Sequence, residues 1–288
     1  MKHIILIPVY DDWKSLNKLL LKLKKNLKNE RKINNEILII NDNSNQKPNI
    51  NSKRLKIFKK IKILSLNKNF GSQIAIAVGL NYLKSQKGNF YVTVMDGDGE
   101  DSPKEIKTML KRAMKFKDYV ITSNRKKRKE SLLIIYLYKL HLLITFLFTF
   151  KWISFGNFST FNKKNLKKIL LNNYSLYAHS SAVLKNCKIK RLYAKREKRF
   201  YDKSKLGIFS LLDHSFRVNS VFYKNIILSS ILYSLIIISI FDQYYGNLFL
   251  FLILSFNLII LFTKIKYWNY NIDYFNSNII NIKLFKTG

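Results

Sequence analysis

Cysteine, proline and glycine are scarce in this chain of 288 residues, which contains 1 Cys, 3 Pro and 9 Gly. The single Cys187 cannot form an internal disulfide, and so few prolines and glycines exclude collagen-like and low-complexity scaffolds. Hydrophobic residues make up 48% of the chain, which is too many for a wholly disordered protein. Folding must therefore depend on the burial of apolar side chains.

Acidic residues are also few: 17 Asp and Glu stand against 52 Lys and Arg, which gives a formal charge of +35. Because abundant Lys, Asn and Ile is also typical of a biased codon usage, the total charge does not by itself identify a partner. Its distribution is more informative, since residues 225–263 contain no Lys or Arg. Basic charge and apolar length are therefore segregated along the chain.

Two apolar segments near the C-terminus, residues 225–241 and 247–263, are each 17 residues long and uncharged. This is the short end of the length that crosses the ~30 Å of a bilayer core, so we expect a transmembrane hairpin. The alternative is a pair of buried helices in a soluble domain. Lys224, Lys264 and Lys266 flank the outer ends of the hairpin, so the positive-inside rule predicts a protein of the cytoplasmic membrane with both chain ends and the N-terminal region in the cytoplasm.

A third apolar segment, residues 131–150, is interrupted by Lys139 and His141. Since a charged Lys is costly inside a bilayer, we expect an interfacial helix rather than a third span. Residues 206–223 are expected to form a helix that docks before the first span. The apolar run at residues 4–9 is too short for a signal peptide.

The N-terminal half alternates strand and helix patterns. We expect helices at residues 15–29, 71–85 and 104–116, and strands at residues 3–9, 36–40, 61–66, 90–95 and 119–122. This alternation predicts an α/β fold with a mostly parallel sheet covered by helices on both faces. Ligands bind such sheets at the carboxyl ends of the strands. Polar clusters follow the strands there, at residues 10–12, 41–44 and 96–101.

Four of the acidic residues lie within residues 96–101, directly after an apolar strand. Carboxylates at alternate positions of a glycine-containing turn are suitable ligands for Mg²⁺ or Mn²⁺ shared with a diphosphate. We therefore expect a metal site at Asp96, Asp98 and Glu100. The alternative is a polar turn before the helix that starts near Pro103.

The order of these motifs resembles that of the family 2 inverting glycosyltransferases, and within them the polyisoprenyl-phosphate glycosyltransferases of the dolichol-phosphate mannose synthase and bactoprenol glucosyltransferase type. Residues 8–12 (PVYDD) resemble P-x-Y-N-E, residues 36–44 (EILIINDNS) resemble E-I-I-V-V-D-D-G-S, and residues 66–79 contain the N-F-G box. Residues 96–103 (DGDGEDSP) resemble D-A-D-L-Q-D-P-P, and residues 196–205 resemble R-x-x-R followed by G-x-S-K. The resemblance implies a GT-A (Rossmann-like) fold.

The resemblance also implies roles for individual residues. A nucleotide pocket would be built from Pro8, Tyr10, Asp12, Asp42 and Asp96. Catalytic roles would fall to Asp98, Arg125 and Arg199, with Asp98, Asp96 and Glu100 at the metal. The phosphates of the donor and the lipid would be bound by Arg128, Arg196, Ser204 and Lys205, because guanidinium groups bind phosphate strongly. Among 52 basic residues, the alternative for each is a solvated surface or contact with anionic lipid.

The sequence departs from the family pattern at two positions. Asn41 replaces the first carboxylate of D-D-G-S, which leaves recognition of uridine or guanosine open. Asn157 stands where an acid is usual in a segment that resembles G-D-F-R-L, and Ser159 stands where Arg is usual. We expect activity to survive, because a phosphate monoester with a second pKa of ~6 can attack without a general base.

We therefore expect transfer of a sugar, with inversion, from a nucleotide diphosphate sugar to undecaprenyl phosphate or a similar polyprenyl phosphate. The expected organisation is a GT-A core (1–130), an interfacial and acceptor-binding segment (131–224), the hairpin (225–263) and a cytoplasmic tail (264–288). The alternatives are a catalytically inactive membrane protein that binds anionic lipid or a partner, and a family 2 transferase that acts directly on a glycan. Nucleic-acid binding suits the charge, but a membrane hairpin and no recognisable reader module argue against it. Association into homo-oligomers stays open.

Overall fold

The computed structural model describes residues 1–288 except 29–31, 126–131, 202–206, 269–270 and 287–288. The chain forms two compact units. The first unit comprises Met1–Arg128, Phe155–Ser204 and Asn271–Gly288, and the second comprises Lys129–Ser154 and Lys205–Tyr270. The segment expected as a cytoplasmic tail therefore contributes its residues from 271 onward to the first unit.

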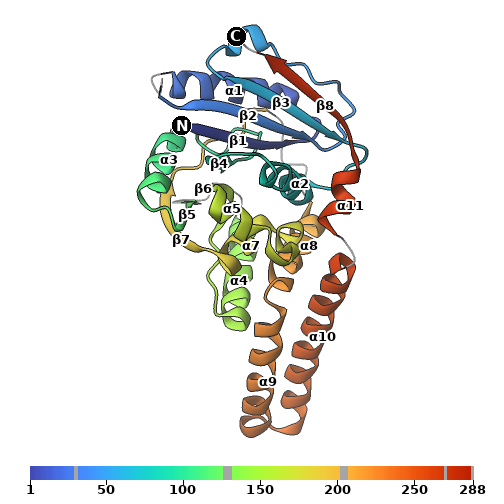
Figure 1. Cartoon of the computed structure of the whole chain (residues 1–288). Coiled ribbons are helices and arrows are strands. Elements are labelled where there is room, and N and C mark those ends of the chain that lie inside the picture. Colours follow the sequence, from blue (N-terminus) through green and yellow to red (C-terminus); the bar gives the residue numbers. More distant parts are fainter. Residues whose placement is uncertain (29–31, 126–131, 202–206, 269–270, 287–288) are drawn as a thin grey trace. The chain divides into compact units, whose positions relative to one another are not determined.

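The first unit begins with the expected alternation of strands and helices (Figure 1). These elements are β1 (Lys2–Val9), α1 (Trp13–Leu27), β2 (Asn34–Asn41), the 3₁₀ turn η1 (Ser52–Leu55), β3 (Lys60–Leu66), α2 (Ser72–Lys84), β4 (Phe90–Val94), α3 (Glu105–Lys115) and β5 (Tyr119–Arg125). Each predicted strand and helix is present within a few residues of its expected bounds. The hydrophobic periodicity was therefore a sufficient guide in this half of the chain.

The remaining elements of the first unit were not expected from the sequence. They are β6 (Phe155–Asn162), α5 (Lys163–Ile169), η2 (Leu171–Asn173), α6 (Tyr174–Tyr177), α7 (His179–Asn186), β7 (Lys188–Ala194), α11 (Ile272–Ser277) and β8 (Ile279–Lys286). The eight strands of the described residues join one sheet in the order β7-β5-β6-β4-β1-β2-β3-β8. Of these strands, β6 and β8 run against the others, so the sheet is mostly parallel, as predicted.

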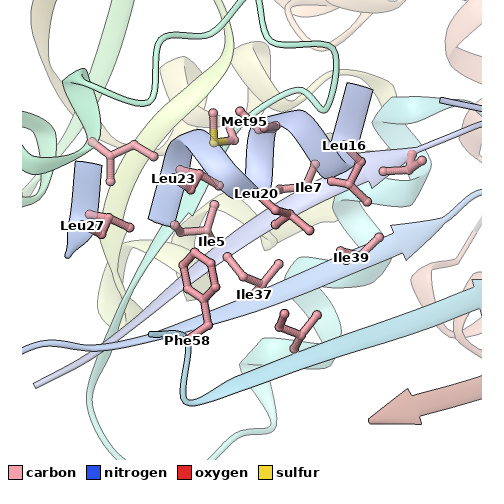
Figure 2. Packing of buried hydrophobic residues seen from close by; sticks show 14 of the residues in the cluster. Ile5, Ile7, Leu16, Leu20, Leu23, Leu27, Ile37, Ile39, Phe58 and Met95 are labelled. Atoms are coloured by element: carbon pink, nitrogen blue, oxygen red, sulfur yellow. The ribbon is translucent and has the colours of Figure 1, made fainter. Parts of the chain in front are cut away.

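Helices cover both faces of this sheet. Figure 2 shows Leu16, Leu20 and Leu23 of α1 lying over Ile5 and Ile37 of the sheet. The apolar residues of α3 join the same core. On the opposite face α2 lies so close that a Cβ on Gly79 would approach the side chains of Leu6 and Ile40 within 3 Å. The strands are apolar where these helices cover both faces of the sheet, and the polar turns begin where that cover ends.

The described residues of the second unit form the helices α4 (Leu132–Thr149), α8 (Ile208–Ser220), α9 (Tyr223–Ile240) and α10 (Gln243–Trp268). Helices α9 and α10 pack against each other as a hairpin (Figure 1). By length and composition, Tyr223–Ile240 and Gln243–Tyr267 are each long and apolar enough to cross a membrane. Large side chains along the hairpin point outward, and Leu228 and Phe262 are 70% and 71% exposed.

Candidate active site

The acidic turn (residues 96–101) follows β4 at the carboxyl edge of the sheet. Two of its carboxylates hold the turn's own backbone: Asp101 Oδ2 accepts from the Asp96 amide at 3.0 Å, and Asp98 Oδ1 accepts from the Glu100 amide at 3.0 Å. Gly99 has a φ of +87°, which favours glycine. A Cβ at this position would also collide with the ring of Phe200. The turn thus needs a glycine between its acids for two separate reasons.

A basic loop (residues 195–201), which follows β7, lies on the acidic turn. Two backbone hydrogen bonds join them: the Glu197 amide donates to the Glu100 carbonyl at 2.9 Å, and the Phe200 amide donates to the Asp98 carbonyl at 3.0 Å. These two bonds fix the alignment of the loop along the turn. This contact brings together segments almost a hundred positions apart in the sequence.

Two arginines of the basic loop pair with the acids. Arg196 forms an ion pair with Glu100. Arg199 bridges two predicted site residues, since its Nη1 lies 3.4 Å from Asp98 Oδ2 and its Nη2 lies 3.2 Å from Asp12 Oδ2. Burial lowers the pKa of Arg196, an effect that Asp98 and Asp96 oppose by favouring the charged guanidinium. The result is a cluster of alternating positive and negative groups at the strand ends.

Glu197 anchors the basic loop from its other side. Its carboxylate accepts from Lys22 Nζ of α1 and from Ser102 Oγ, each at 2.9 Å. Burial raises the pKa of Glu197, but the hydrogen bonds from Lys22 and Ser102 lower it more, so the net direction is downward. The loop is thus fixed both to the acidic turn and to the first helix.

Asp42, predicted to bind nucleotide, supports the N-F-G box in this structure. Its two carboxylate oxygens accept from the backbone amides of Phe70 at 2.9 Å and Gly71 at 2.8 Å. Burial raises the pKa of Asp42, and these two hydrogen bonds oppose the shift. Gly71 has a φ of +87° and precedes the first residue of α2. Two motifs that are separate in the sequence, the segment with Asp42 and the N-F-G box, are therefore in direct contact in the fold.

The other predicted nucleotide residues lie around the end of β1. Pro8 is buried within the strand, and Tyr10 is 38% exposed just after it. Asp11, next to them, ties this turn to the one after β2, because its Oδ1 accepts from the Asn45 amide at 2.7 Å. Asp12 precedes α1 and pairs with Arg199. The predicted nucleotide residues thus lie at the ends of three strands. The end of β1 has Pro8, Tyr10 and Asp12, the end of β2 has Asp42, and the end of β4 has Asp96.

The two asparagines that replace acids of the family pattern use both ends of their amides. Asn41 donates to Ser65 Oγ at 3.3 Å and accepts from the Ser44 amide at 3.0 Å. Asn157 of β6 donates to Asp96 Oδ1 at 2.9 Å and accepts from Gln73 Nε2 at 3.1 Å. A carboxylate has no donor, so at position 157 it could not reproduce the bond to Asp96. At position 41 the Ser65 hydroxyl could donate to a carboxylate instead.

A small cavity opens beside the acidic turn. Its lining comes from the turn itself, from β5 and β6, and from the residues after β7: Asp96, Glu100, Asp101, Ser102, Ser123, Asn124, Gly156, Asn157, Phe158, Ala194, Lys195 and Arg196. Two of the predicted acids, Asp96 and Glu100, therefore share one concave surface with Arg196, whereas Asp98 is not among its lining residues. Asn157 lines it too, although no sequence pattern predicted its place beside Asp96.

The residues available for a divalent cation are oxygen donors, as Mg²⁺ and Mn²⁺ require. Within the described part of the chain, however, no group of three or more His, Cys, Asp or Glu side chains is arranged to hold a metal. Asp98 and Glu100 instead face Arg199 and Arg196. The donor set suits a cation that takes most of its ligands from a diphosphate and water, and the three-carboxylate site stays a prediction.

Several predicted residues lie outside what the structure describes. Arg128, Ser204 and Lys205 fall in undescribed segments, and only the backbone of Arg125, at the end of β5, is described. Their roles stay predictions. Sequence reasoning missed Lys22, Glu197 and Gln73, because each is recognisable only from contacts with distant segments.

His179 is held inside the first unit, away from solvent. Its ring is fully buried and bonds Ser159 Oγ at 2.8 Å, and burial lowers its pKa to about 3. Cys187 is half-buried, and burial raises its pKa to about 11. A thiol with that pKa is almost entirely protonated at neutral pH, so it is a weak nucleophile.

Comparison with known proteins places the fold. A family model described as "Glycosyl transferase family 2" matches residues 4–185. The chain is 30% identical over 132 residues to the uncharacterized glycosyltransferase YkcC of Bacillus subtilis (strain 168), a match that covers 46% of this chain and 39% of the relative. It is 30% identical over 131 residues to the uncharacterized glycosyltransferase sll0501 of Synechocystis sp. (strain ATCC 27184 / PCC 6803 / Kazusa), covering 44% and 39%. The matches therefore span about two fifths of the length of these curated relatives.

Among solved structures, the chain is similar to glucosyl-3-phosphoglycerate synthase from Mycobacterium tuberculosis in complex with Mn²⁺, uridine-diphosphate-glucose and phosphoglyceric acid. The TM-score is 0.52 at 10% identity, with 78% of this chain and 79% of that chain covered. Mannosyl-3-phosphoglycerate synthase from Rubrobacter xylanophilus gives a TM-score of 0.50 at 12% identity, covering 79% and 74%. At such identities the likeness establishes the GT-A fold alone.

Proposed function

Because the chain belongs to glycosyl transferase family 2, we propose that it transfers a sugar, with inversion, from a nucleotide diphosphate sugar to a polyprenyl phosphate at a membrane surface. The observation that carries this proposal is the docking of the basic loop on the acidic turn, which gathers Asp98, Glu100, Arg196 and Arg199 at one edge of the sheet. Such an edge is where ligands of open α/β sheets bind.

The basic residues have a clear task in this reaction. The donor carries a diphosphate and the acceptor carries a phosphate, and guanidinium groups bind phosphate oxygens through two N–H donors at once. Arg199 already joins Asp12 on the nucleotide side to Asp98 on the diphosphate side. In the proposal, Arg196 and Arg199 orient the two phosphorylated substrates, so that alignment rather than proton transfer provides most of the rate enhancement.

A divalent cation is part of the proposal. The glucosyl-3-phosphoglycerate synthase structure contains Mn²⁺ together with its nucleotide sugar. Asp98, with Asp96 and Glu100, would hold Mg²⁺ or Mn²⁺ here, and the cation would neutralise the negative charge that develops on the leaving diphosphate. The hydrogen bond from Asn157 would orient the Asp96 carboxylate.

The lipid acceptor is supported by the apolar helices α9 and α10, whose outward-facing side chains suit a hydrocarbon environment. Chain connectivity supports a two-span topology. Strand β8 pairs with β3, which supports a proposed arrangement in which the chain before α9 and after α10 lies on one side of the membrane, as two crossings would give. Likewise the pairing of β5 with β6 supports the proposal that α4 begins and ends on the same side, as an interfacial helix would.

Two alternatives make different predictions. A catalytically inactive membrane protein would bind nucleotide or anionic lipid without turnover. A transferase that acts directly on a glycan would form a water-soluble product. The orientation with the first unit in the cytoplasm is part of our proposal, because Lys224, Lys264 and Lys266 flank the outer ends of the hairpin.

The test uses membranes that contain the full chain, incubated with undecaprenyl phosphate, Mn²⁺ and a panel of radiolabelled nucleotide sugars. We expect one sugar to enter the organic phase, and chelation of the metal to stop its transfer. Asp118→Asn should transfer the same sugar as the unsubstituted chain, because Asp118 is an exposed acid that precedes β5 and forms its ion pair with Lys164. A product that stays in the aqueous phase, or no product with any donor, would overturn the proposal.

A further inference from the structure

A chain of four polar groups connects the acidic turn to the start of helix α7. The His179 amide donates to Gln73 Oε1 at 2.8 Å, Gln73 Nε2 donates to Asn157 Oδ1 at 3.1 Å, and Asn157 Nδ2 donates to Asp96 Oδ1 at 2.9 Å. These groups come from α7, α2, β6 and the turn after β4. We call this chain the amide relay.

The direction of the relay is fixed at its far end. A backbone amide can only donate, so the atom of Gln73 that faces His179 must be the carbonyl oxygen. The NH₂ group of Gln73 then faces Asn157 and selects the carbonyl oxygen of that side chain. Consequently the NH₂ group of Asn157 is directed at Asp96. Each amide orientation follows from the one before it.

We propose that Gln73 is a positioning residue that acts through Asn157 to fix the Asp96 carboxylate for the reaction. The relay supplies Asp96 with a hydrogen-bond donor but adds no charge. Residue 157 must then be an amide, because a carboxylate there could not donate and would place a second negative charge beside Asp96. The relay thus accounts for the asparagine at a position where the family pattern has an acid.

Burial makes the relay strict about its polarity. Gln73 is only 7% exposed, and His179 is fully buried. At this inner end of the relay, an amide turned the wrong way would leave two oxygens or two N–H groups facing each other in a buried environment, which is costly. Asn157 and Asp96, at the outer end, are half-buried. The relay is therefore a unit that either keeps its direction throughout or reverses it from residue 73 to residue 96.

This reversal provides the test. In Gln73→Glu the new carboxylate still accepts from His179 but cannot donate to Asn157, so the Asn157 amide must turn and its oxygen then faces Asp96. We expect the midpoint of thermal unfolding to fall by ~3–8 °C at pH 8. In the double variant Gln73→Glu with Asp96→Asn, the new amide donates to the turned Asn157. We expect this variant to unfold at the same temperature as Asp96→Asn alone.

The matched control is Gln73→Glu combined with Asp98→Asn, which removes a neighbouring negative charge outside the relay. We expect no rescue in this combination. Equal rescue by both second substitutions would mean that Gln73→Glu acts only through net charge. Additive losses in the Asp96→Asn combination would mean that the side chains merely fill space. Either result would overturn the proposal.

A second readout is the pH dependence of Gln73→Glu. Below the pKa of the newly introduced, buried carboxyl group, the protonated acid donates again to Asn157. The deficit in unfolding temperature relative to the unsubstituted chain should therefore shrink from pH 8 to pH 5.5. The titratable groups of the relay are Asp96, the new acid and His179, and His179 stays neutral in this range because burial lowers its pKa to about 3. A deficit that does not change with pH would contradict the inference.

The catalytic part of the inference rests on the proposed function. In the transfer assay, Gln73→Glu should lower kcat by ~10-fold at pH 8 with a smaller change in KM, and the loss should diminish toward pH 5.5. If no donor is turned over by the unsubstituted chain, the proposed function fails while the unfolding cycle still decides the relay. A normal kcat with a broken relay would overturn the positioning role alone.

Discussion

The turns after β2 and β4 both present buried or half-buried carboxylates at the same edge of the sheet, but they are held in different ways. Asp42, after β2, gives both oxygens to backbone amides of the N-F-G box. Asp98 and Glu100, after β4, face arginine side chains of the basic loop. A backbone amide cannot leave without unfolding the turn, whereas an arginine can exchange a carboxylate for a phosphate. Asp98 also accepts from the Glu100 amide through its Oδ1, so only its Oδ2 and the Glu100 carboxylate face arginines. We therefore propose an architectural role for the first turn and a ligand-binding role for the second.

The strongest test of this contrast is Asp98→Ala. Removing this carboxylate should lower sugar transfer by roughly 10²–10³-fold, because the developing charge on the leaving group loses its stabilisation. The fold should be retained, as measured by circular dichroism and thermal unfolding in detergent. Asp118→Ala is the control and should transfer sugar normally. Unfolding of Asp98→Ala would place this turn in the architectural class instead.

A pH titration examines the framework beneath both turns. His3 is fully buried between Asn35 and Thr93, and burial lowers its pKa to about 4. In the unfolded chain His3 binds a proton near pH 6.5 and in the folded chain it does not, so its contribution to stability is lost as the pH falls from 6.5 to 4, by about 3 kcal/mol. Urea unfolding across this range measures the loss. In His3→Gln the loss should be smaller, and an equal loss would assign it to other groups.

Asp42→Asn addresses the architectural turn. The new NH₂ group would face a backbone N–H, so one of the two hydrogen bonds is replaced by a repulsive contact. We expect a decrease of ~1–3 kcal/mol in the free energy of unfolding, measured with urea. Asp118→Asn, which removes a negative charge at an exposed position, provides a control for the change of charge. Full stability combined with loss of nucleotide binding would instead give Asp42 the role that the family resemblance implies.

The smallest effect is expected for Glu197→Gln, which weakens the anchor of the basic loop to Lys22. The pair is partly exposed to solvent, so the change in stability should be below about 1 kcal/mol. The KM for the acceptor should rise modestly, since Arg196 and Arg199 lose part of their support. Steady-state kinetics at two salt concentrations measure the KM of Glu197→Gln. The control for a general electrostatic effect is Lys164→Gln, which breaks an exposed pair and should leave KM unchanged.

The sequence predicted the elements of the first half because their apolar residues repeat with the period of a strand or a helix. It missed β6 because the apolar residues Phe155, Phe158 and Phe161 recur every third position, which is not the period of a strand. The residues between them are also buried or half-buried. It missed β7, whose sequence KIKRLYA has three basic residues, and β8, whose pairing with β3 joins residues more than two hundred positions apart.

The site was predicted in the same uneven way. The acidic turn was recognisable because acids are rare in this chain and four of them lie together. Its partners were recognisable only as basic residues among many. The bond from Arg199 to Asp12 spans 187 positions, and the amide relay has no pattern in the sequence because each member is an ordinary polar residue until the fold brings it to its neighbour.

The pairing of β8 with β3 also sets an order of events during synthesis. A ribosome makes β1 to β7 first, then the helices α8 to α10, and only afterwards the residues of β8. Until then the outer edge of β3 lacks its neighbour and stays open to other chains. The last strand can close that edge only after the apolar hairpin has emerged, so maturation of the sheet waits for synthesis of the helices that precede its final strand.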